Sequence, residues 1–236
     1  MDKLRVDVWS DIACPWCFVG KRRLEAALAR LPEAERKQVE VTWHAFELDP
    51  EAPRERERSE SYAERLAKKY GMSVAQAEAR IASMTEVAKA DGVNFDFARI
   101  RPGNTFDAHR LLHLAAERGL QDALKERFLL GYMSEGEAIG QPEALERLAI
   151  EAGLGASEVR AVLTSDRYAA EVRADERDAR ELGINGVPFF VLDERLAVSG
   201  AQPTELFLRA LKQAFADRAA RPAQFEEGAL CGPDGC

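Results

Sequence analysis

Cys14-Pro15-Trp16-Cys17 places two cysteines three positions apart, between a strand pattern and a helical pattern. Before this motif, apolar and charged residues alternate over residues 4–8, as in a β-strand with one buried face. After it, apolar residues recur about every 3.6 positions, as on one face of a helix (Phe18, Leu24, Leu28, Leu31). The first cysteine is therefore predicted to stand at the N-terminus of a helix that follows a strand.

A cysteine in that position is expected to be reactive. Unpaired backbone N–H groups and the helix dipole favour a thiolate there, and only the thiolate is a nucleophile. Cys17 lies one turn further on the same side and can close a small disulfide ring with Cys14, while Pro15 suits helix entry because it needs no N–H. Half of a zinc site and an inert pair are the alternatives. The strand before and the helix after favour redox chemistry.

The composition is that of a soluble globular protein, with 46% hydrophobic and 31% charged residues among 236. The formal net charge is −8 and lysines and arginines form no dense stripe, which argues against binding to nucleic acid or an anionic membrane. No apolar signal segment or membrane-spanning stretch is present. We therefore expect a cytoplasmic protein, in which closely spaced cysteines indicate catalysis or metal binding.

The order of predicted elements indicates a sheet interrupted by helices. A second strand is expected over residues 39–44, and residues 51–60 are interpreted as a charged, solvated connector. From about residue 59 to 183 every strong signal is helical, including a Ser73–Gln76 capping box. Strands then resume at residues 187–192 and 195–199, joined by a tight turn at residues 193–194, and Pro203 begins a last helix. The chain is thus expected to leave a sheet and return to it.

Pro188 is the second informative residue. A proline at the start of a buried strand lacks the donor that a central ladder needs, so it marks a special position. The neighbours Gly186-Val187 and Phe189-Phe190 suit a cis peptide bond. A trans proline at a strand start is the commoner alternative in general.

Taken together, several segments resemble the DsbA family of thioredoxin-fold oxidoreductases, in its cytoplasmic FrnE-like branch. They are spread over residues 4–215 and comprise Ser10-Asp11 with the cysteine motif, Asn104-Thr105, Ala108-His109-Arg110, residues 186–190 and residues 198–203. The resemblance implies an α/β protein, a thioredoxin fold with a large inserted all-helical domain. Residues 1–55 and 184–219 would form the thioredoxin-like domain, 56–183 the insert, and 220–236 a flexible tail.

The resemblance also implies roles for the motif. Cys14 would be the attacking, partly exposed thiolate, and Cys17 the buried cysteine that resolves the mixed disulfide. Pro188 would be cis and face Cys14, while Val187 offers its backbone to an extended substrate strand. Trp16 is neutral, so we expect a less oxidising couple than in periplasmic members with a histidine in the motif.

Partners implied by the resemblance are thiol- or disulfide-containing proteins, with glutathione or a thioredoxin-type protein as recycling partner. The redox-active disulfide itself is the only redox group expected, without a separate cofactor or metal. The direction of electron flow, the substrates and the oligomeric state stay open.

Polar residues near the motif have two interpretations each. Asp11 could assist proton transfer, but capping of the turn is the better prediction. His109 and Asn104 fall in the matching segments and could lie near Cys14. His109 and His113 are four apart on one helical face, yet no third metal ligand is evident, so a packed pair is favoured. His44 is expected to be structural.

The C-terminal tail ends in Cys231-Gly232-Pro233-Asp234-Gly235-Cys236, whose turn-forming residues allow the two sulfurs to meet. The pair could be a second redox couple that exchanges electrons with Cys14 and Cys17. It could also complete a four-thiol zinc site, which would block Cys14, or be inert.

Two other function classes are compatible with the same architecture. Kappa-class glutathione transferases and 2-hydroxychromene-2-carboxylate isomerases share it but typically carry a lone serine at the position of Cys14, so the intact pair argues against them. A chaperone that binds extended polypeptide near Pro188 would need no cysteine.

Overall fold

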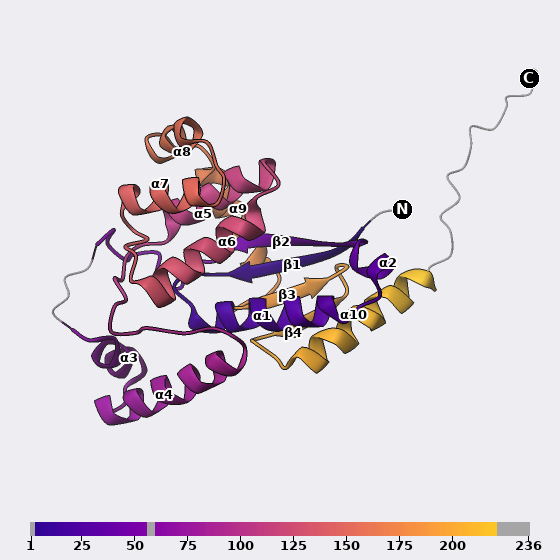
Figure 1. Ribbon diagram of the computed structural model, residues 1–236, viewed down its shortest axis with the longest axis horizontal. Helices are drawn as coiled ribbons and strands as arrows, with labels where there is room; N and C mark the ends of the chain where they lie inside the picture. The colour runs from indigo at the N-terminus through magenta and orange to yellow at the C-terminus, as the bar shows by residue number, and fades with distance from the viewer. Residues whose placement is uncertain (1–2, 56–59, 221–236) are drawn as a thin grey trace, which may run out of the picture.

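The computed structural model describes residues 3–55 and 60–220. Its centre is a four-stranded sheet in the order β2-β1-β3-β4 (Figure 1). Strand β1 (Leu4–Ser10) is parallel to β2 (Val39–Ala45) and antiparallel to β3 (Phe189–Leu192), which pairs antiparallel with β4 (Leu196–Ser199). The predicted α/β architecture, a sheet that the chain leaves for a long helical insertion and then rejoins, is confirmed.

Helices α1 (Pro15–Ala29) and α10 (Thr204–Ala219) pack side by side against one face of the sheet (Figure 1). Their apolar stripes and the inward residues of the strands form one continuous core, with Leu24, Phe190, Phe207 and Leu211 fully or almost fully buried. A short helix α2 (Glu33–Arg36) joins α1 to β2. This core fixes the end of β1 and the start of α1, where the cysteine motif lies.

The described residues of the inserted segment form helices joined by loops, with no strand among them, as predicted, and they have two parts (Figure 1). Helices α3 (Tyr62–Tyr70) and α4 (Val74–Ala90) pair as a hairpin, and each begins with a capping box, including the predicted Ser73–Gln76 box. The other part contains the remaining helices, namely α5 (Phe106–Glu117), α6 (Gln121–Leu130), the π-helix η1 (Gly131–Glu135), α7 (Pro142–Glu151), α8 (Ala156–Leu163) and α9 (Ala169–Glu181). The sequence pattern did not predict α3 and α8 as separate helices.

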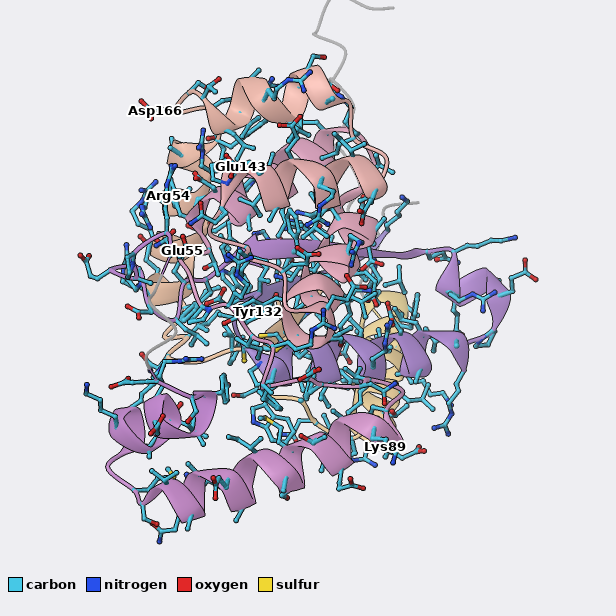
Figure 2. The ribbon with its side chains drawn as sticks, turned by 60° about the vertical axis from the view of Figure 1, so that its left-hand side comes forward. Arg54, Glu55, Lys89, Tyr132, Glu143 and Asp166 are labelled. Carbon is cyan, nitrogen blue, oxygen red and sulfur yellow. The ribbon has the colours of Figure 1, made fainter. Side chains whose placement is uncertain are left out.

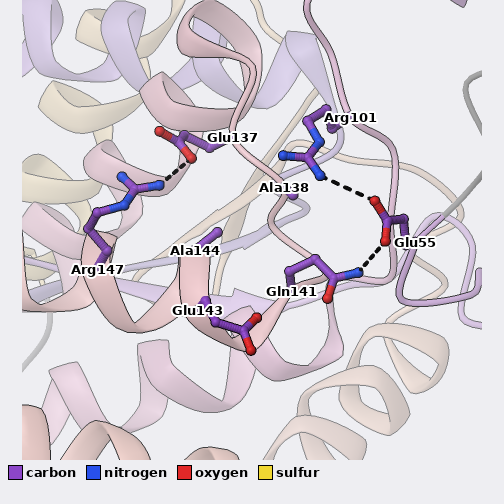
Figure 3. A pocket seen from close by; sticks show the side chains of 8 residues that line it. All are labelled: Glu55, Arg101, Glu137, Ala138, Gln141, Glu143, Ala144 and Arg147. Atoms are coloured by element: carbon purple, nitrogen blue, oxygen red, sulfur yellow. Dashed lines mark hydrogen bonds and ion pairs between the residues drawn. The ribbon is translucent and has the colours of Figure 1, made fainter.

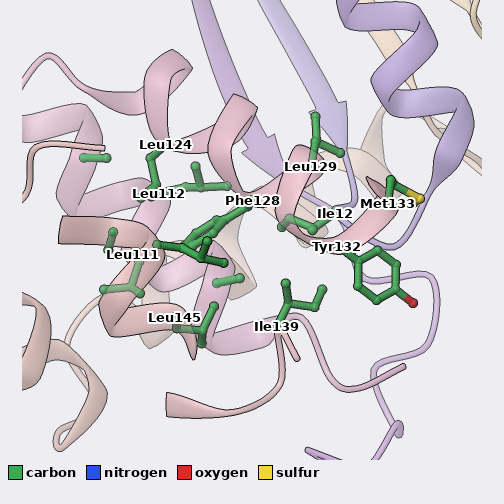
Figure 4. Close-up of a cluster of buried hydrophobic side chains, with 14 of the residues drawn as sticks. Ile12, Leu111, Leu112, Leu124, Phe128, Leu129, Tyr132, Met133, Ile139 and Leu145 are labelled. Atoms are coloured by element: carbon green, nitrogen blue, oxygen red, sulfur yellow. The ribbon is translucent and has the colours of Figure 1, made fainter. Parts of the chain in front are cut away.

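The core of the insert reaches directly to the cysteine motif. Ile12, which precedes Cys14, is buried among side chains of α5, α6 and η1 such as Leu111, Phe128 and Met133 (Figure 4). Phe18 and Val19 of α1 belong to the same cluster. The turn before α1 is therefore held between the sheet and the insert, which restricts how the cysteines can move.

The tight turn predicted at residues 193–194 is present. Asp193 and Glu194 both have positive φ values, 52° and 60°, which match a type I′ hairpin turn between β3 and β4. The proposed division into domains at residues 55, 183 and 219 stays a prediction.

Candidate active site

The cysteine motif lies at the start of α1. Cys14 is the N-cap residue in an extended conformation, Pro15 is in the first turn, and the amide of Cys17 donates to the carbonyl of Cys14 at 3.0 Å. Both cysteines are free thiols. Cys14 thus stands at the N-terminus of a helix that follows a strand, as the sequence pattern predicted.

Cys14 is more enclosed than expected. Only 5% of its surface is exposed and Cys17 is fully buried, whereas Trp16 is 40% exposed. The prediction of a partly exposed Cys14 is therefore wrong for this structure. Tyr62 of helix α3 packs against the buried cluster that contains Ile12, and its ring meets that of Phe97 at a tilt of 42°, with centroids 4.6 Å apart. Burial first, and the charge of Cys14 second, raise the pKa of Tyr62 to about 12.

The Val187–Pro188 peptide bond is cis, as predicted. The thiol of Cys14 donates to the carbonyl of Val187 at 3.4 Å, so this sulfur contacts the backbone of the loop. The carbonyl of Pro188 accepts from the amide of Gly200 at 2.8 Å, which ties the loop to the end of β4. The structure therefore brings the motif and the proline loop together.

Gly20 is a residue that the sequence reasoning missed. A Cβ atom at this position of α1 would lie 2.9 Å from Cγ of Pro188 and 3.2 Å from Cζ of Phe190. Glycine costs about 1 kcal/mol relative to alanine inside a helix, and such a glycine often has a packing reason. Here the reason is the close approach of α1 to the proline loop.

Asp11 holds the turn that precedes Cys14. Its carboxylate accepts from the amides of Ala13 at 3.2 Å and Leu48 at 2.8 Å, so it caps this turn and ties it to the loop after β2. Oδ1 of Asp11 also lies 3.5 Å from Nε2 of His109, and both side chains are buried. Burial raises the pKa of Asp11, but His109 and the two amides outweigh it, and the net pKa is below the ordinary value.

Lys125 of α6 is a second residue that the sequence reasoning missed. Its side chain is fully buried, and Nζ donates to the carbonyl of Ser10 at the end of β1 at 3.3 Å. Burial lowers the pKa of Lys125 to about 8, while Cys17, Asp11 and Cys14 act in the opposite direction. The signal was its spacing, because Lys125 stands three and four positions before the buried Phe128 and Leu129.

The buried thiol of Cys17 has a pKa well above the ordinary value. Burial is the largest cause, followed by the hydrogen bond and charge of Cys14, whereas Lys125 and the backbone of Asp11 lower the pKa. Cys17 is thus held in its protonated form until a base or a nearby cation changes the balance.

Asn104 stands one position before Thr105, the N-cap residue of α5. Its side-chain oxygen accepts from the amide of Phe106 at 2.8 Å, and its nitrogen lies 3.3 Å from Oε1 of Glu47 and 3.2 Å from the carbonyl of Pro50. None of these contacts involves a cysteine. Asn104 therefore orders the loop after β2, next to the residues that Asp11 binds.

The other histidines belong to a separate network. Nε2 of His113 lies 3.0 Å from Oδ2 of Asp175, and Nδ1 of His44 lies 2.9 Å from Oδ1 of the same residue. Within residues 3–55 and 60–220, no group of three or more His, Cys, Asp or Glu residues could hold a metal ion. Cys231 and Cys236, the predicted second pair, lie outside the described residues.

A surface hollow of about 400 Å³ lies between the loop after β2 and α7, on the part of the insert where Figure 2 labels Glu55 and Glu143. Two ion pairs lie in its lining, since Arg101 binds Glu55 at 3.2 Å and Arg147 binds Glu137 (Figure 3). It contains neither cysteine, so we assign the chemistry to the region around Cys14. No helix in the described part of the chain is apolar over enough residues to cross a membrane.

Comparison with known proteins gives a consistent result. A family model described as a DSBA-like thioredoxin domain matches residues 5–212. The crystal structure of a probable DsbA oxidoreductase from Streptomyces coelicolor is 48% identical, with a TM-score of 0.88, and the match covers 99% of this chain and 98% of that one. The uncharacterized protein YwbO of Bacillus subtilis is 27% identical over 88% of this chain and 96% of its own length.

More distant structures share the fold. The cytosolic disulfide reductase DsbM from Pseudomonas aeruginosa, solved with GSH, is 18% identical with a TM-score of 0.58, and the match covers 92% of this chain and 98% of that one. A 2-hydroxychromene-2-carboxylate isomerase is 14% identical with a TM-score of 0.59, over 91% of this chain and 98% of that one.

Proposed function

Because the chain belongs to the DsbA-like thioredoxin domain family, we propose that it is a thiol–disulfide oxidoreductase that acts on protein substrates through Cys14 and Cys17. One observation carries this proposal. The thiol of Cys14 sits at the N-terminus of α1 and contacts the carbonyl of Val187, next to the cis peptide bond of Pro188. A reactive sulfur thus lies beside backbone that an extended peptide can pair with.

The reaction takes place in two exchanges. The Cys14 thiolate attacks a substrate disulfide, forms a mixed disulfide and releases one substrate thiolate. The Cys17 thiolate then attacks Cys14, the mixed disulfide breaks, and the second substrate sulfur leaves as a thiolate. The substrate is reduced by two electrons and the cysteine pair is oxidised by two. The reverse sequence oxidises a substrate dithiol.

Trapping the mixed disulfide tests this function. In a Cys17→Ala variant, Cys14 can attack but cannot be released by its neighbour, so covalent adducts with disulfide-containing proteins should accumulate and be visible by mass spectrometry. A Cys14→Ala variant is the matched control and should form none. Absence of adducts on Cys14 in the Cys17→Ala variant would refute the proposal.

The finer assignments are part of the same proposal. Membership of the FrnE-like branch, a cytoplasmic location and glutathione or a thioredoxin-type protein as recycling partner are proposed from the sequence resemblance. The structure of DsbM with GSH supports glutathione as a candidate by fold likeness. Measuring the equilibrium of the Cys14–Cys17 couple against glutathione tests this partner and the direction of exchange.

We propose Cys231 and Cys236 as a second redox pair on the evidence of their spacing alone. If they relay electrons to Cys14 and Cys17, replacing both by serine should slow insulin reduction or thiol oxidation. Unchanged rates would remove the pair from the mechanism.

A glutathione-dependent isomerase is the alternative function. The shared fold is the observation in its favour, and the intact Cys14–Cys17 pair argues against it.

A further inference from the structure

The loop between α9 and β3 contains an asparagine followed by a glycine, Asn185-Gly186. Both residues are exposed and lie outside helices and strands. The chain enters this loop at Ile184, which is buried and hydrogen-bonded to the end of α9. It continues to Val187, whose carbonyl accepts the thiol of Cys14 at 3.4 Å. Two exposed residues thus separate a buried anchor from the backbone that contacts the reactive sulfur.

Gly186 presents an accessible backbone nitrogen. A Cβ atom at this position would meet no atom within 4 Å apart from those of its chain neighbours, so open space surrounds the residue. Among the described residues, the amide of Gly186 finds no hydrogen-bond acceptor. Glycine has no side chain that could shield this nitrogen from the side-chain carbonyl carbon of the preceding asparagine.

The side chain of Asn185 is held by one exposed contact, in which Nδ2 donates to the carbonyl of Gly183 at 3.1 Å. A hydrogen bond of this kind contributes about 1 kcal/mol net, so breaking it slows a reaction by less than about tenfold. Asn104 is held more firmly, because its side-chain oxygen accepts from the amide of Phe106 and its nitrogen donates to the carbonyl of Pro50. The side chain of Asn185 is therefore free to turn towards the amide that follows it.

We propose that Asn185 is a modification site, at which the backbone nitrogen of Gly186 attacks the side-chain amide and converts the asparagine into aspartate or isoaspartate. The nitrogen forms a bond to Cγ of Asn185, and the side-chain amide nitrogen leaves as ammonia with the proton of the Gly186 amide. Water then opens the resulting cyclic imide. Opening at the side-chain carbonyl gives aspartate, and opening at the backbone carbonyl gives isoaspartate, in which the backbone runs through Cβ.

Isoaspartate lengthens the backbone between two fixed points. Ile184 is anchored in a buried cluster, and the carbonyl of Pro188 accepts from the amide of Gly200 at 2.8 Å. An additional backbone atom between these anchors displaces Val187 from Cys14. Because a misplacement of about 1 Å can cost about 100-fold in rate, modified molecules should exchange disulfides slowly. This consequence, unlike the modification itself, rests on the proposed function.

Peptide mapping tests the modification. The full-length reduced protein is incubated at mildly alkaline pH and physiological temperature, digested and analysed by mass spectrometry, with isoaspartate separated from aspartate by chromatography. Asn185 should convert. Asn94 is the internal control, because it is also exposed but is followed by the bulky Phe95. An absence of conversion at Asn185, or equal conversion at Asn94, would overturn the proposal.

A Gly186→Ala variant tests the part of the glycine. The added methyl group has room, since nothing outside the neighbouring residues lies within 4 Å of its position, so the loop should keep its conformation. The methyl group shields the backbone nitrogen, and conversion at Asn185 should slow markedly. Conversion at the wild-type rate in this variant would show that attack by the Gly186 nitrogen is not the route.

Single-turnover exchange with insulin as the disulfide-containing probe tests the consequence for the reaction. Incubated wild type should oxidise its Cys14–Cys17 pair in two phases, one at the original rate and one about 100-fold slower. The amplitude of the slow phase should equal the isoaspartate fraction from peptide mapping. An Asn185→Gln variant incubated in parallel should show the fast phase alone, because its longer side chain closes a larger ring more slowly.

Freshly purified Asn185→Asp separates charge from backbone length. It adds the carboxylate alone, and salt screens an exposed charge, so its exchange rate should stay close to that of wild type. Exchange as slow as the slow phase in this variant would overturn displacement of Val187 as the cause. A single fast phase despite isoaspartate would overturn the effect on exchange. If unincubated wild type does not react with insulin, the proposed function fails, whereas peptide mapping still decides the modification.

Discussion

Nδ1 of His44 lies 2.9 Å from Oδ1 of Asp175, so a histidine of strand β2 is bound to a carboxylate of helix α9. The other ring nitrogen, Nε2, lies 2.9 Å from Oδ1 of Asp7 on β1. The imidazole also stacks on Trp9 with ring centroids 4.6 Å apart. A single side chain thus joins the sheet to the insert behind the active site.

This arrangement predicts a pH dependence of stability. Burial lowers the pKa of His44, but its contacts with Asp175 and Asp7 outweigh it and raise the pKa to about 9. Because the folded pKa exceeds the unfolded value of 6.5, the stabilisation is complete below pH 6.5 and is lost as the pH rises towards 9. The difference corresponds to at most about 3 kcal/mol.

Urea unfolding between pH 6 and pH 9.5 measures this effect. The wild-type free energy of unfolding should fall over this interval, and a His44→Gln variant should be less stable at pH 6 with a flatter profile. A His113→Gln variant, in which Asp175 keeps its contact with His44, is the matched comparison and should keep the fall in stability over this interval. Parallel profiles for wild type and His44→Gln would contradict the assignment.

A second prediction concerns Gly20. A Gly20→Ala variant gains helix propensity of about 1 kcal/mol, yet its Cβ would lie 2.9 Å from the ring of Pro188. Overpacking of a buried contact costs about 1–3 kcal/mol, so we expect a net loss of stability. We also expect slower disulfide exchange, because the proline loop must shift from Cys14. Thermal unfolding and an insulin reduction assay measure both effects.

The exposed Ala26 in the same helix provides the control. An Ala26→Gly variant changes propensity in the opposite direction without touching the proline loop. It should lower stability by about 1 kcal/mol and leave the exchange rate unchanged. If Gly20→Ala proves more stable and fully active, the close contact with Pro188 does not constrain the site.

A third prediction concerns the pH dependence of stability that the buried carboxyl of Glu47 causes. Its carboxyl is buried after β2, and burial raises its pKa to about 7 despite the contact with Arg173 at 2.6 Å. For an acid with a raised folded pKa, stability is greatest below the unfolded value of 4.5 and declines as the pH rises to 7. The maximum loss is on the order of 3 kcal/mol.

A Glu47→Gln variant should therefore gain relative stability between pH 5 and pH 8, because an amide cannot ionise. Chemical unfolding at the two pH values measures the change in the difference between variant and wild type. Glu40→Gln, on an exposed position of β2, should show no such change. A constant difference between Glu47→Gln and wild type from pH 5 to pH 8 would exclude ionisation of Glu47 in this range.

The sequence predicted features that depend on local chemistry. The helix after Cys14, the Ser73–Gln76 capping box and the turn at Asp193 follow from spacing, capping and turn preferences within a few residues. The family resemblance added the fold and the cis bond at Pro188. These signals carry no information on which distant side chains meet.

The features that the sequence reasoning missed depend on contacts between residues that are far apart in the sequence. Lys125 meets the carbonyl of Ser10 across more than one hundred positions, and an isolated lysine in an apolar stripe is usually assigned to the surface. Cys14 is enclosed, and its thiol meets the carbonyl of Val187 across 173 positions. The spacing of Lys125 could indicate that it is buried, but only the folded arrangement shows which residues it and Cys14 meet.

The last prediction concerns the contribution of Arg110 to stability. This buried residue of α5 donates from Nε to the carbonyl of Arg167 at 2.9 Å and from Nη1 to Asp107 at 2.8 Å, and Nη2 binds the carbonyls of Val162 and Ser165. One guanidinium thereby fastens the segment between α8 and α9 to α5.

A lysine has the charge of arginine but not its planar fork, so Arg110→Lys leaves several of these acceptors unsatisfied. We expect a loss of about 3 kcal/mol or more, because each buried unsatisfied group costs about 1–3 kcal/mol. Thermal and urea unfolding measure it, with Arg160→Lys on the exposed face of α8 as a control that should change stability by less than about 0.5 kcal/mol. Equal stability of Arg110→Lys and Arg160→Lys would show that the fork of Arg110 does not hold these helices together.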